Sequence, residues 1–309
     1  MRERRHITVM LGGPSAEREV SLRSGAAVAR ALSALGHEVS TLDPVTPGWA
    51  LPAGTEVVVL MLHGTYGEDG TVQRELEALG VPYTGCDAAA SRIAFDKVLT
   101  KRRCLVAGVP TPRFAVFREV PAAFPAGWTP PLVLKPVRQG SSVGLEFVDR
   151  DGDFAPALAR ALRHDTEVLM EERIRGVETT VAVLDGEALP VVEVCPRSGG
   201  YDYTNKYTAG NTEYFCPARL DAETTHRVQA AALEACHAVG VRDYARVDVM
   251  VDAARQPFVL EVNTLPGMTE LSLFPKAAAA AGLSFSALCQ RLVDLALRRR
   301  QRPIVPTGG

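Results

Sequence analysis

Apolar and amphipathic segments alternate along the first ninety or so residues of the chain. The apolar run 6–11 is broken by glycines, and 20–35 then carries apolar residues at helical spacing. Strand-like segments follow at 38–42 and 56–62, and the second is continuously apolar, as expected of a parallel strand covered on both faces. This alternation predicts a doubly wound α/β unit, whose ligands bind outside the carboxyl ends of the strands.

The remainder of the chain mixes strand-like and helical segments. One long helix is predicted over 87–107, and the proline-containing stretch 109–112 after it requires extended backbone, typical of a domain boundary. The polar, aromatic stretch 199–212 is predicted to be a functional loop. Further strands are predicted at 114–117, 131–135, 145–148, 167–172, 179–184, 188–194, 245–251 and 257–263, and helices at 154–163, 222–239 and 284–300. The pattern therefore predicts an α/β domain followed by two mixed α+β units.

Composition narrows the class of protein. The 309 residues are 47% apolar and 23% charged, with a formal net charge of −2. These values exclude a disordered or fibrous chain and give no electrostatic reason to expect nucleic acid or a membrane surface as a partner. The six cysteines show no metal-binding spacing, and no apolar run has the length of a signal peptide or a membrane span. We expect a cytoplasmic protein that acts on small molecules.

The hairpin predicted at 245–263 carries the clearest candidate chemistry. Alternation places Arg246 and Asp248 on one face of the first strand, and Glu261 and Asn263 on one face of the second. Two carboxylates and an amide oxygen then converge, which suits Mg²⁺ bound together with phosphates. The alternative is a solvated polar face, the usual arrangement in an alternating strand. The opposite faces are predicted to carry Val247, Val249, Val251, Phe258, Leu260 and Val262.

Lysine is scarce in this chain, with only five among 34 basic residues, so each lysine is more informative than an arginine. Lysine is a compact charge that suits phosphate oxygens. Lys135 ends a predicted strand and precedes a loop, 136–144, that contains two glycines and two serines. Backbone N–H groups and hydroxyls of such a loop favour phosphate binding, although the Walker A ending is absent. The alternative is a plain hairpin turn.

Two loops fall at the predicted carboxyl edge of the N-terminal sheet, 12–17 and 63–70. His63, in the second loop, is either a substrate contact or a residue that only supports the loop. The first loop lacks the GxGxxG pattern of dinucleotide-binding turns, which disfavours an oxidoreductase.

Four separate segments together resemble the D-alanine–D-alanine ligase family of the ATP-grasp superfamily. They are GGPSAEREVS, HGTYGEDGTVQ, LKPVRQGSSVG and ARVDVMV with LEVNTLPGMT; YDYTNKY and DKVLTK match as well. The resemblance covers about residues 6–300. It implies an ATP-grasp fold with a Rossmann-like substrate domain (1–93), a central ATP-grasp subdomain (94–175) and a C-terminal subdomain with the metal and catalytic residues (176–309). It further implies a homodimer that ligates two D-alanines through an acylphosphate, using ATP, for peptidoglycan precursor synthesis.

The resemblance also implies roles for single residues in the substrate site. Glu17 would bind the ammonium group of the first D-alanine, with Ser21 and His63 beside it. Arg246 and the backbone of Gly267 would stabilise the transferring phosphoryl group and the oxyanion. Ser272 and Leu273 would receive the carboxylate of the second D-alanine, and Ser141 and Tyr207 would link the glycine–serine loop to a lid, 199–212, through Glu17.

For the nucleotide, the resemblance implies phosphate contacts from lysines and an adenine site along 171–174. The implied nucleotide-binding set is Lys97, Lys135, Ser141, Ser142, Glu171, Glu172, Ile174, Glu178 and Lys206. Asp248, Glu261 and Asn263 would bind two Mg²⁺ or Mn²⁺ ions.

Two stretches depart from the commonest pattern of the family, Glu270-Leu271 before Ser272 and the sequence 92–95. The alternatives to the main function are a D-alanine:D-lactate ligase on the same fold and a nucleotide-binding module without ligase activity.

Overall fold

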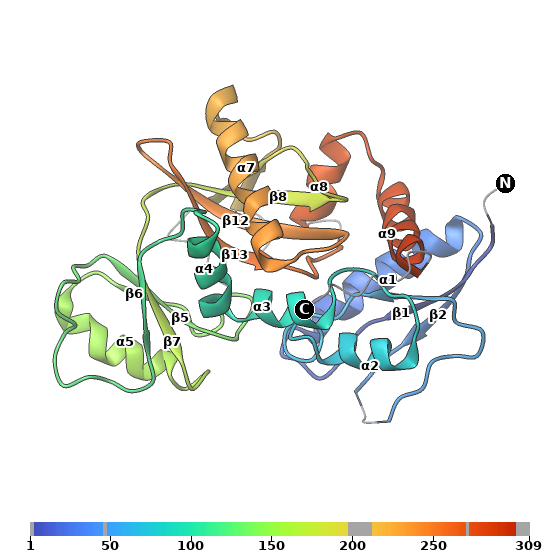
Figure 1. The fold of residues 1–309 in the computed structure, drawn as a ribbon, viewed down its shortest axis with the longest axis horizontal. Coiled ribbons are helices and arrows are strands. Elements are labelled where there is room, and N and C mark those ends of the chain that lie inside the picture. Colours follow the sequence, from blue (N-terminus) through green and yellow to red (C-terminus); the bar gives the residue numbers. More distant parts are fainter. Residues whose placement is uncertain (1–2, 46–47, 197–211, 270–271, 301–309) are drawn as a thin grey trace, which may run out of the picture.

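The computed structural model describes residues 3–45, 48–196, 212–269 and 272–300, which form three sheets with helices packed around them (Figure 1). The N-terminal sheet is parallel, with the order β2-β1-β3. Its strands are β1 (His6–Met10), β2 (Glu38–Leu42) and β3 (Val57–Leu60); α1 (Arg18–Ala34) joins the first two strands, and α2 (Thr71–Leu79) follows the third. The predicted α/β unit is confirmed, and an isolated parallel bridge between Val58 and Tyr83 follows α2.

The single helix predicted over 87–107 is wrong. Two helices occupy this stretch, α3 (Ala88–Phe95) and α4 (Lys97–Val106), and Asp96 between them is extended at φ −88 and ψ 104. The Asp96 carboxylate accepts a hydrogen bond from the Leu99 backbone N–H and so caps the second helix. An aspartate inside an otherwise helical pattern was the signal for this break.

The central sheet is antiparallel, with the order β4-β7-β5-β6. It comprises β4 (Phe114–Phe117), β5 (Leu132–Pro136), β6 (Glu146–Val148) and β7 (Val168–Glu172). The short 3-10 helix η1 (Asp151–Asp153) and α5 (Phe154–Ala161) follow β6, and α5 packs its apolar side on one face of the sheet. The other face carries Lys135 and Glu171 and faces α4.

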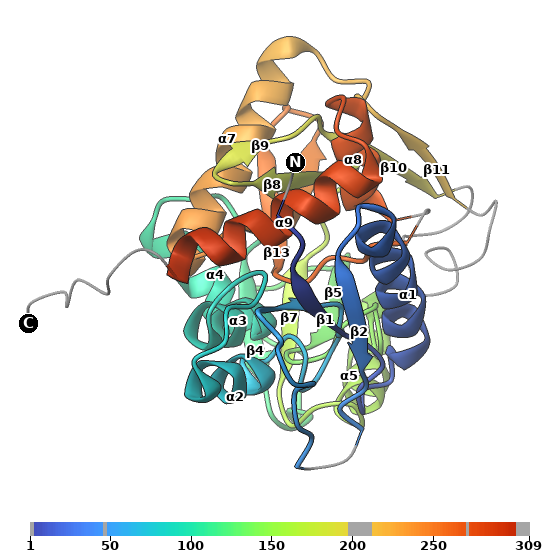
Figure 2. The ribbon, with the colours of Figure 1, turned by 90° about the vertical axis from the view of Figure 1, so that its right-hand side faces the viewer.

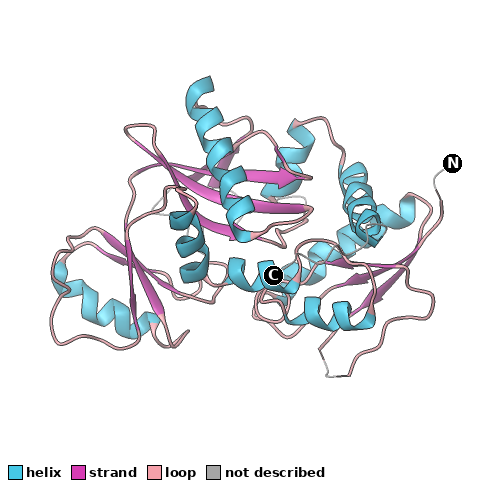
Figure 3. Ribbon diagram, viewed as in Figure 1, coloured by secondary structure: helices cyan, strands magenta, loops and turns pink. Residues whose placement is uncertain are grey.

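The third sheet has six strands, ordered β11-β10-β8-β12-β13, with β9 paired to β8. They are β8 (Gly176–Leu184), β9 (Glu187–Ala188), β10 (Val192–Pro196), β11 (Thr212–Phe215), β12 (Tyr244–Asp252) and β13 (Pro257–Asn263). One face packs on α7 (Ala222–Val239), while α8 (Leu273–Ala280) contacts β8 and β10. The sequence pattern missed β11 and α8, and it merged β9 and β10. Figure 3 shows the alternation of helices and strands across all three parts.

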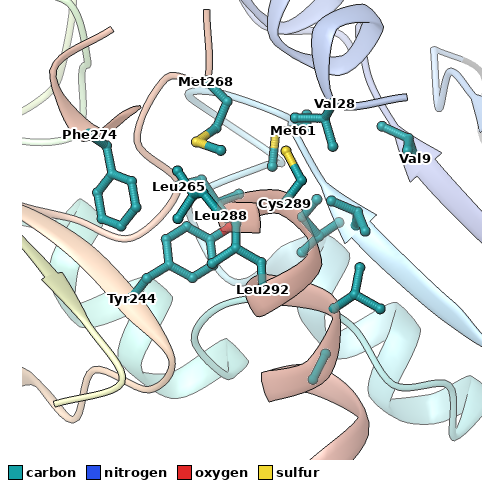
Figure 4. Close-up of a cluster of buried hydrophobic side chains, with 14 of the residues drawn as sticks. Val9, Val28, Met61, Tyr244, Leu265, Met268, Phe274, Leu288, Cys289 and Leu292 are labelled. Atoms are coloured by element: carbon teal, nitrogen blue, oxygen red, sulfur yellow. The ribbon is translucent and has the colours of Figure 1, made fainter. Parts of the chain in front are cut away.

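The final helix, α9 (Phe285–Arg300), returns to the N-terminal sheet and packs against α1 and β3 (Figure 2). Leu288 and Leu292 enter the same apolar cluster as Val28, as Figure 4 shows. Tyr244 of the six-stranded sheet belongs to that cluster and meets Phe274 edge to face at 5.6 Å. One continuous core therefore joins the N-terminal and six-stranded sheets.

In the described ranges no single helix is long and apolar enough to cross a membrane. Only α8 and the described part of α9 taken together reach that length and apolar content, and the angle between these two helices is 102°.

Candidate active site

The predicted polar hairpin forms as expected. Arg246 pairs with Asn263 and Asp248 with Glu261 across β12 and β13. The intervening valines of β12 lie in the core against α7. The Asp248 side chain is only 18% exposed, so the face that it shares with Arg246 is not a solvated strand face.

A β-bulge corrects the predicted orientation of two apolar residues. The register shifts after Asp248, so that Val249 pairs with Val259 and Leu260 has no direct partner. Val259 and Val262 both enter the core, whereas Leu260 lines a cleft together with Asp248 and Glu261. The prediction that Leu260 and Phe258 lie opposite Glu261 is therefore wrong, because strict alternation fails at a bulge.

Asp248 is held by a dense hydrogen-bond network. Arg246 donates from Nε to Oδ1 and from Nη2 to Oδ2, each over 2.8 Å. Thr180 on β8 donates its hydroxyl to Oδ1 over 2.8 Å, and Asn263 Nδ2 lies 3.3 Å from Oδ2. This network fixes the carboxylate plane at the centre of the hairpin face.

The donor set fits a hard divalent cation. Asn263 Nδ2 lies within 3.5 Å of Glu261 Oε1 as well as near Asp248, so one small region holds all three side chains. A metal would require the amide of Asn263 to turn over, which would present its carbonyl oxygen and end its contact with Asp248 Oδ2. Carboxylate and amide oxygens are the ligands that Mg²⁺ takes in proteins.

Two lysines predicted for the nucleotide lie in the same cleft as the hairpin carboxylates. Lys97 donates to the carbonyl oxygen of Gln139 over 2.6 Å, and its Nζ lies 3.8 Å from Glu261 Oε2. Lys135 Nζ lies 2.6 Å from Glu171 Oε2. Burial favours a higher pKa for Glu171, but the ammonium groups of Lys101 and Lys135 outweigh it and hold that pKa at about 2.

The other residues of the predicted nucleotide set are divided between the cleft and the surface. Ser141, Ser142 and Glu178 line the cleft. The side chain of Glu172 is exposed, and its Oε1 lies 3.7 Å from Arg113 Nη1. Ile174, just beyond β7, is half-buried.

The glycine–serine loop is built for close approach to Glu17. Ser141 and Ser142 have φ values of 50 and 58, a region that non-glycine residues seldom adopt. The Ser141 hydroxyl donates to Glu17 Oε1, and a Cβ on Gly140 would overlap the other oxygen of this carboxylate. Arg138, at the start of the loop, is anchored by Asp165 Oδ1 at 2.6 Å and Glu167 Oε2 at 2.7 Å. Glu17 and Ser141 are thus brought together as predicted.

A second carboxylate, not predicted, lies near Glu17. Glu68 Oε2 accepts a hydrogen bond from the Gly64 backbone N–H over 2.6 Å, within the loop that also holds the buried His63. Burial and the negative charge of Glu17 raise the pKa of Glu68 to about 8. The carboxyl oxygens of Glu17 and Glu68 together suit a cationic group.

Ser21 and Ser272 occupy different kinds of position. Ser21 is fully buried; its hydroxyl accepts from Gly12 N–H over 2.8 Å and donates to the Met61 carbonyl over 2.7 Å. It joins the ends of β1 and β3 behind the loops, a supporting position. Ser272 precedes α8, and its Oγ is so close to Gly267 that a Cβ there would lie 2.8 Å away. Leu273, the first residue of α8, is buried in the core.

Four residues of the predicted site or its neighbourhood lie outside the described residues: Lys206, Tyr207, Glu270 and Leu271.

Comparisons with known proteins agree with this geometry. A family model described as D-ala D-ala ligase C-terminus matches residues 108–294, and one described as D-ala D-ala ligase N-terminus matches residues 48–86. The chain belongs to the D-alanine–D-alanine ligase family. The predicted family and its ATP-grasp fold are confirmed.

Individual relatives cover nearly the whole chain. A D-alanine--D-alanine ligase from Methylacidiphilum infernorum is 46% identical over 298 residues, 96% of each chain. The solved D-alanine--D-alanine ligase of Bacillus anthracis superposes with a TM-score of 0.84 at 35% identity, covering 96% of this chain and 99% of that one. VanG D-Ala:D-Ser ligase from Enterococcus faecalis superposes with a TM-score of 0.83 at 31% identity, covering 95% of this chain and 100% of that one.

Sequence reasoning missed four residues that shape this site: Thr180, Leu260, Glu68 and Lys101. Lys101 was detectable, because it is one of the scarce lysines and lies four residues after Lys97 on a predicted helix, where i and i+4 share a face. Thr180 and Glu68 reach the site only through sheet register and loop folding, for which the sequence carries no local signal.

Proposed function

We propose that this protein uses ATP to ligate two D-alanine molecules into D-alanyl-D-alanine, releasing ADP and phosphate, for the synthesis of peptidoglycan precursors. The observation that carries the proposal is the charge division of one site: lysines and a cation-ligand set on one side of the glycine–serine loop, and paired carboxylates on the other. Membership of the ligase family supports the same reaction.

In the first step, a carboxylate oxygen of the first D-alanine attacks the γ-phosphorus of ATP, the bond to the β-phosphate oxygen breaks, and ADP leaves. Lys97 and Lys135, which line the cleft, neutralise phosphate charge in this step. Phosphoryl transfer depends mainly on positioning and charge neutralisation, and this site needs no covalent nucleophile. Mg²⁺ bound by Asp248, Glu261 and Asn263 would add electrostatic stabilisation of the phosphates.

In the second step, the free amine of the second D-alanine attacks the acyl carbon, phosphate leaves, and the nitrogen loses a proton. Glu17, held by Ser141, binds the ammonium group of the first D-alanine and orients its acyl group. The backbone N–H of Gly267 and the guanidinium of Arg246 stabilise the oxyanion. Ser272 and Leu273, at the start of α8 and beside Gly267, bind the carboxylate of the second D-alanine.

The product is tested directly with purified protein, ATP and Mg²⁺. Phosphate release is measured with D-alanine alone, with L-alanine, and with D-alanine plus D-lactate or D-serine, and products are identified by mass spectrometry. We expect D-alanyl-D-alanine as the main product at neutral pH. A preference for D-lactate or D-serine would overturn the specificity, and the absence of any ATP-dependent product would favour a non-catalytic nucleotide-binding module.

We assign this specificity to Tyr207, whose hydroxyl would complete a hydrogen-bonded chain with Ser141 and Glu17. A site built to pair polar groups penalises a substrate that leaves them unpaired. Tyr207→Phe is expected to raise the share of D-alanyl-D-lactate in a competition between D-alanine and D-lactate from pH 6 to 9. An unchanged product ratio would remove Tyr207 from this role.

We also propose that the enzyme is a cytoplasmic homodimer. Sedimentation analysis of the purified protein tests the dimer, and a monomer at micromolar concentration would contradict it. Fractionation of the source cells tests the location.

A further inference from the structure

A buried ion cluster beneath the nucleotide cleft joins α4 to the central sheet. Lys101 and Glu171 are each 1% exposed. Lys101 Nζ lies 2.7 Å from Glu171 Oε1, and Lys135 Nζ lies 2.6 Å from Glu171 Oε2. One carboxylate is thus shared between two ammonium groups, and the ionised cluster retains a positive charge beside the cleft.

Lys101 makes two further hydrogen bonds, both to residues that do not line the cleft. Its ammonium group donates to Thr111 Oγ1 over 2.6 Å and to the Pro112 carbonyl over 3.1 Å. With Glu171, these acceptors match the three donors of a lysine ammonium. Thr111 donates in turn to the Val259 carbonyl of β13 over 2.8 Å, which ties the cluster to the six-stranded sheet. Lys101 does not line the cleft, and its ammonium group is engaged by Glu171, Thr111 and Pro112.

We propose that Lys101 is a positioning residue for ATP: by binding one oxygen of Glu171, it leaves Lys135 only partly neutralised and holds Lys135 Nζ at the cleft. The inference rests on the proposed function, in which Lys135 contacts ATP phosphates. Without Lys101, Glu171 and Lys135 would form a neutral pair, and Glu171 Oε1 would lose its cation in a buried setting.

The first test is Lys101→Met, with ATP binding measured in the absence of D-alanine and steady-state kinetics measured separately. We expect the Kd and KM for ATP to rise about tenfold, the scale of one charge-assisted contact, while the KM for D-alanine changes by less than about twofold. Lys101→Arg keeps the charge and should recover most of the ATP affinity. Cys104→Ala, a buried substitution on the same helix, is the matched control and should leave the Kd for ATP unchanged.

The double variant separates positioning from general stabilisation. If Lys101 acts through Lys135, Lys101→Met should have little further effect on the Kd for ATP in a Lys135→Met background. Equal effects in both backgrounds would show that Lys101 is merely structural and would overturn the inference. An unchanged Kd for ATP in Lys135→Met alone would instead refute the assignment of Lys135 to ATP, and the inference with it.

Thr111→Val provides a second route if Lys101→Met does not fold. It keeps the charge of Lys101 but removes the hydroxyl that holds it, so the Kd for ATP should rise about two- to threefold, the scale of one neutral hydrogen bond. An unchanged Kd in a folded Thr111→Val protein, checked by circular dichroism, would contradict the positioning role.

Discussion

The two halves of the site hold carboxyl groups in opposite ways. Glu171 lies between two ammonium groups, which hold its pKa at about 2, so it is ionised at neutral pH. Glu68 lies half-buried near Glu17, and its loss of solvent together with this negative charge raises its pKa to about 8. Under the proposed function, the lysines of one half bind the phosphate anions of ATP, and the carboxyl groups of the other half bind the ammonium group of an amino acid.

The difference shows how one site can separate the groups that face phosphate from the groups that face the ammonium end of an amino acid. The glycine–serine loop forms the boundary, because Lys97 holds its Gln139 carbonyl on one side and Ser141 donates to Glu17 on the other. Substitutions in one half should therefore affect one substrate much more than the other.

The largest effect is expected from Lys135→Met. Loss of a buried cation from the phosphate side should lower kcat/KM for ATP by about 100-fold or more and leave the Kd for D-alanine nearly unchanged. Lys276→Met is the matched control, since Lys276 lies on α8 with its ammonium 5.6 Å from the Tyr214 ring. Similar losses from the two substitutions would refute the phosphate role.

Glu17→Gln should have the converse effect. Loss of the negative charge should raise the KM for the first D-alanine by about tenfold to 100-fold, because a charged hydrogen bond to ammonium is replaced by a neutral one. The KM for ATP should change by less than about threefold. Initial rates measured against each substrate in turn check this, and a larger change for ATP would show that the two halves are not separate.

The contributions of Glu68 and Glu171 to stability should also depend on pH with opposite signs. The pKa of Glu68 is raised from 4.5 to about 8, so its contribution to stability is present at low pH and is lost as pH rises from about 4.5 to 8. Glu68→Gln should remove this loss of stability, so that the melting temperature changes less with pH over that range. The pKa of Glu171 is lowered to about 2, so its contribution to stability is lost as pH falls from about 4.5 to 2. Glu171→Gln should reduce this loss of stability at acid pH. Melting temperatures measured against pH without ligands test both predictions. If the melting temperature of Glu68→Gln depends on pH above pH 5 as that of the unsubstituted protein does, the raised pKa of Glu68 beside Glu17 is contradicted.

The smallest effect is expected from Asp96→Ala. Loss of the cap of α4 should lower the free energy of unfolding by about 1 kcal/mol. Because α4 carries Lys97 and Lys101, a small rise in the KM for ATP should accompany this change, without any rise for D-alanine. Urea unfolding and steady-state kinetics measure the two effects. A rise in KM for D-alanine alone would contradict the placement of α4 in the half that binds ATP.

Local pattern alone accounted for much of the fold and for the cation-ligand face. Strand alternation placed Arg246 and Asp248 on one side of β12, and the register of the hairpin then aligned Glu261 with Asp248. Motif spacing indicated the family, and the scarcity of lysine drew attention to Lys135. These features depend on neighbours close in the chain, which is why sequence periodicity could reveal them.

Only the tertiary structure decided how distant segments complete the site. The bulge beside Asp248 turned Leu260 into the cleft, and the core shared by α9 and β3 joined the two ends of the chain. The opposite charge states of Glu171 and Glu68 depend on which groups are packed against each carboxylate once it is withdrawn from water. Lys101 comes from 70 residues before Glu171, and Glu17 lies 124 residues from Ser141. The sequence determined which ionisable groups were present, but burial and partners set their charge, because Coulomb interactions act through space and strengthen where solvent is excluded.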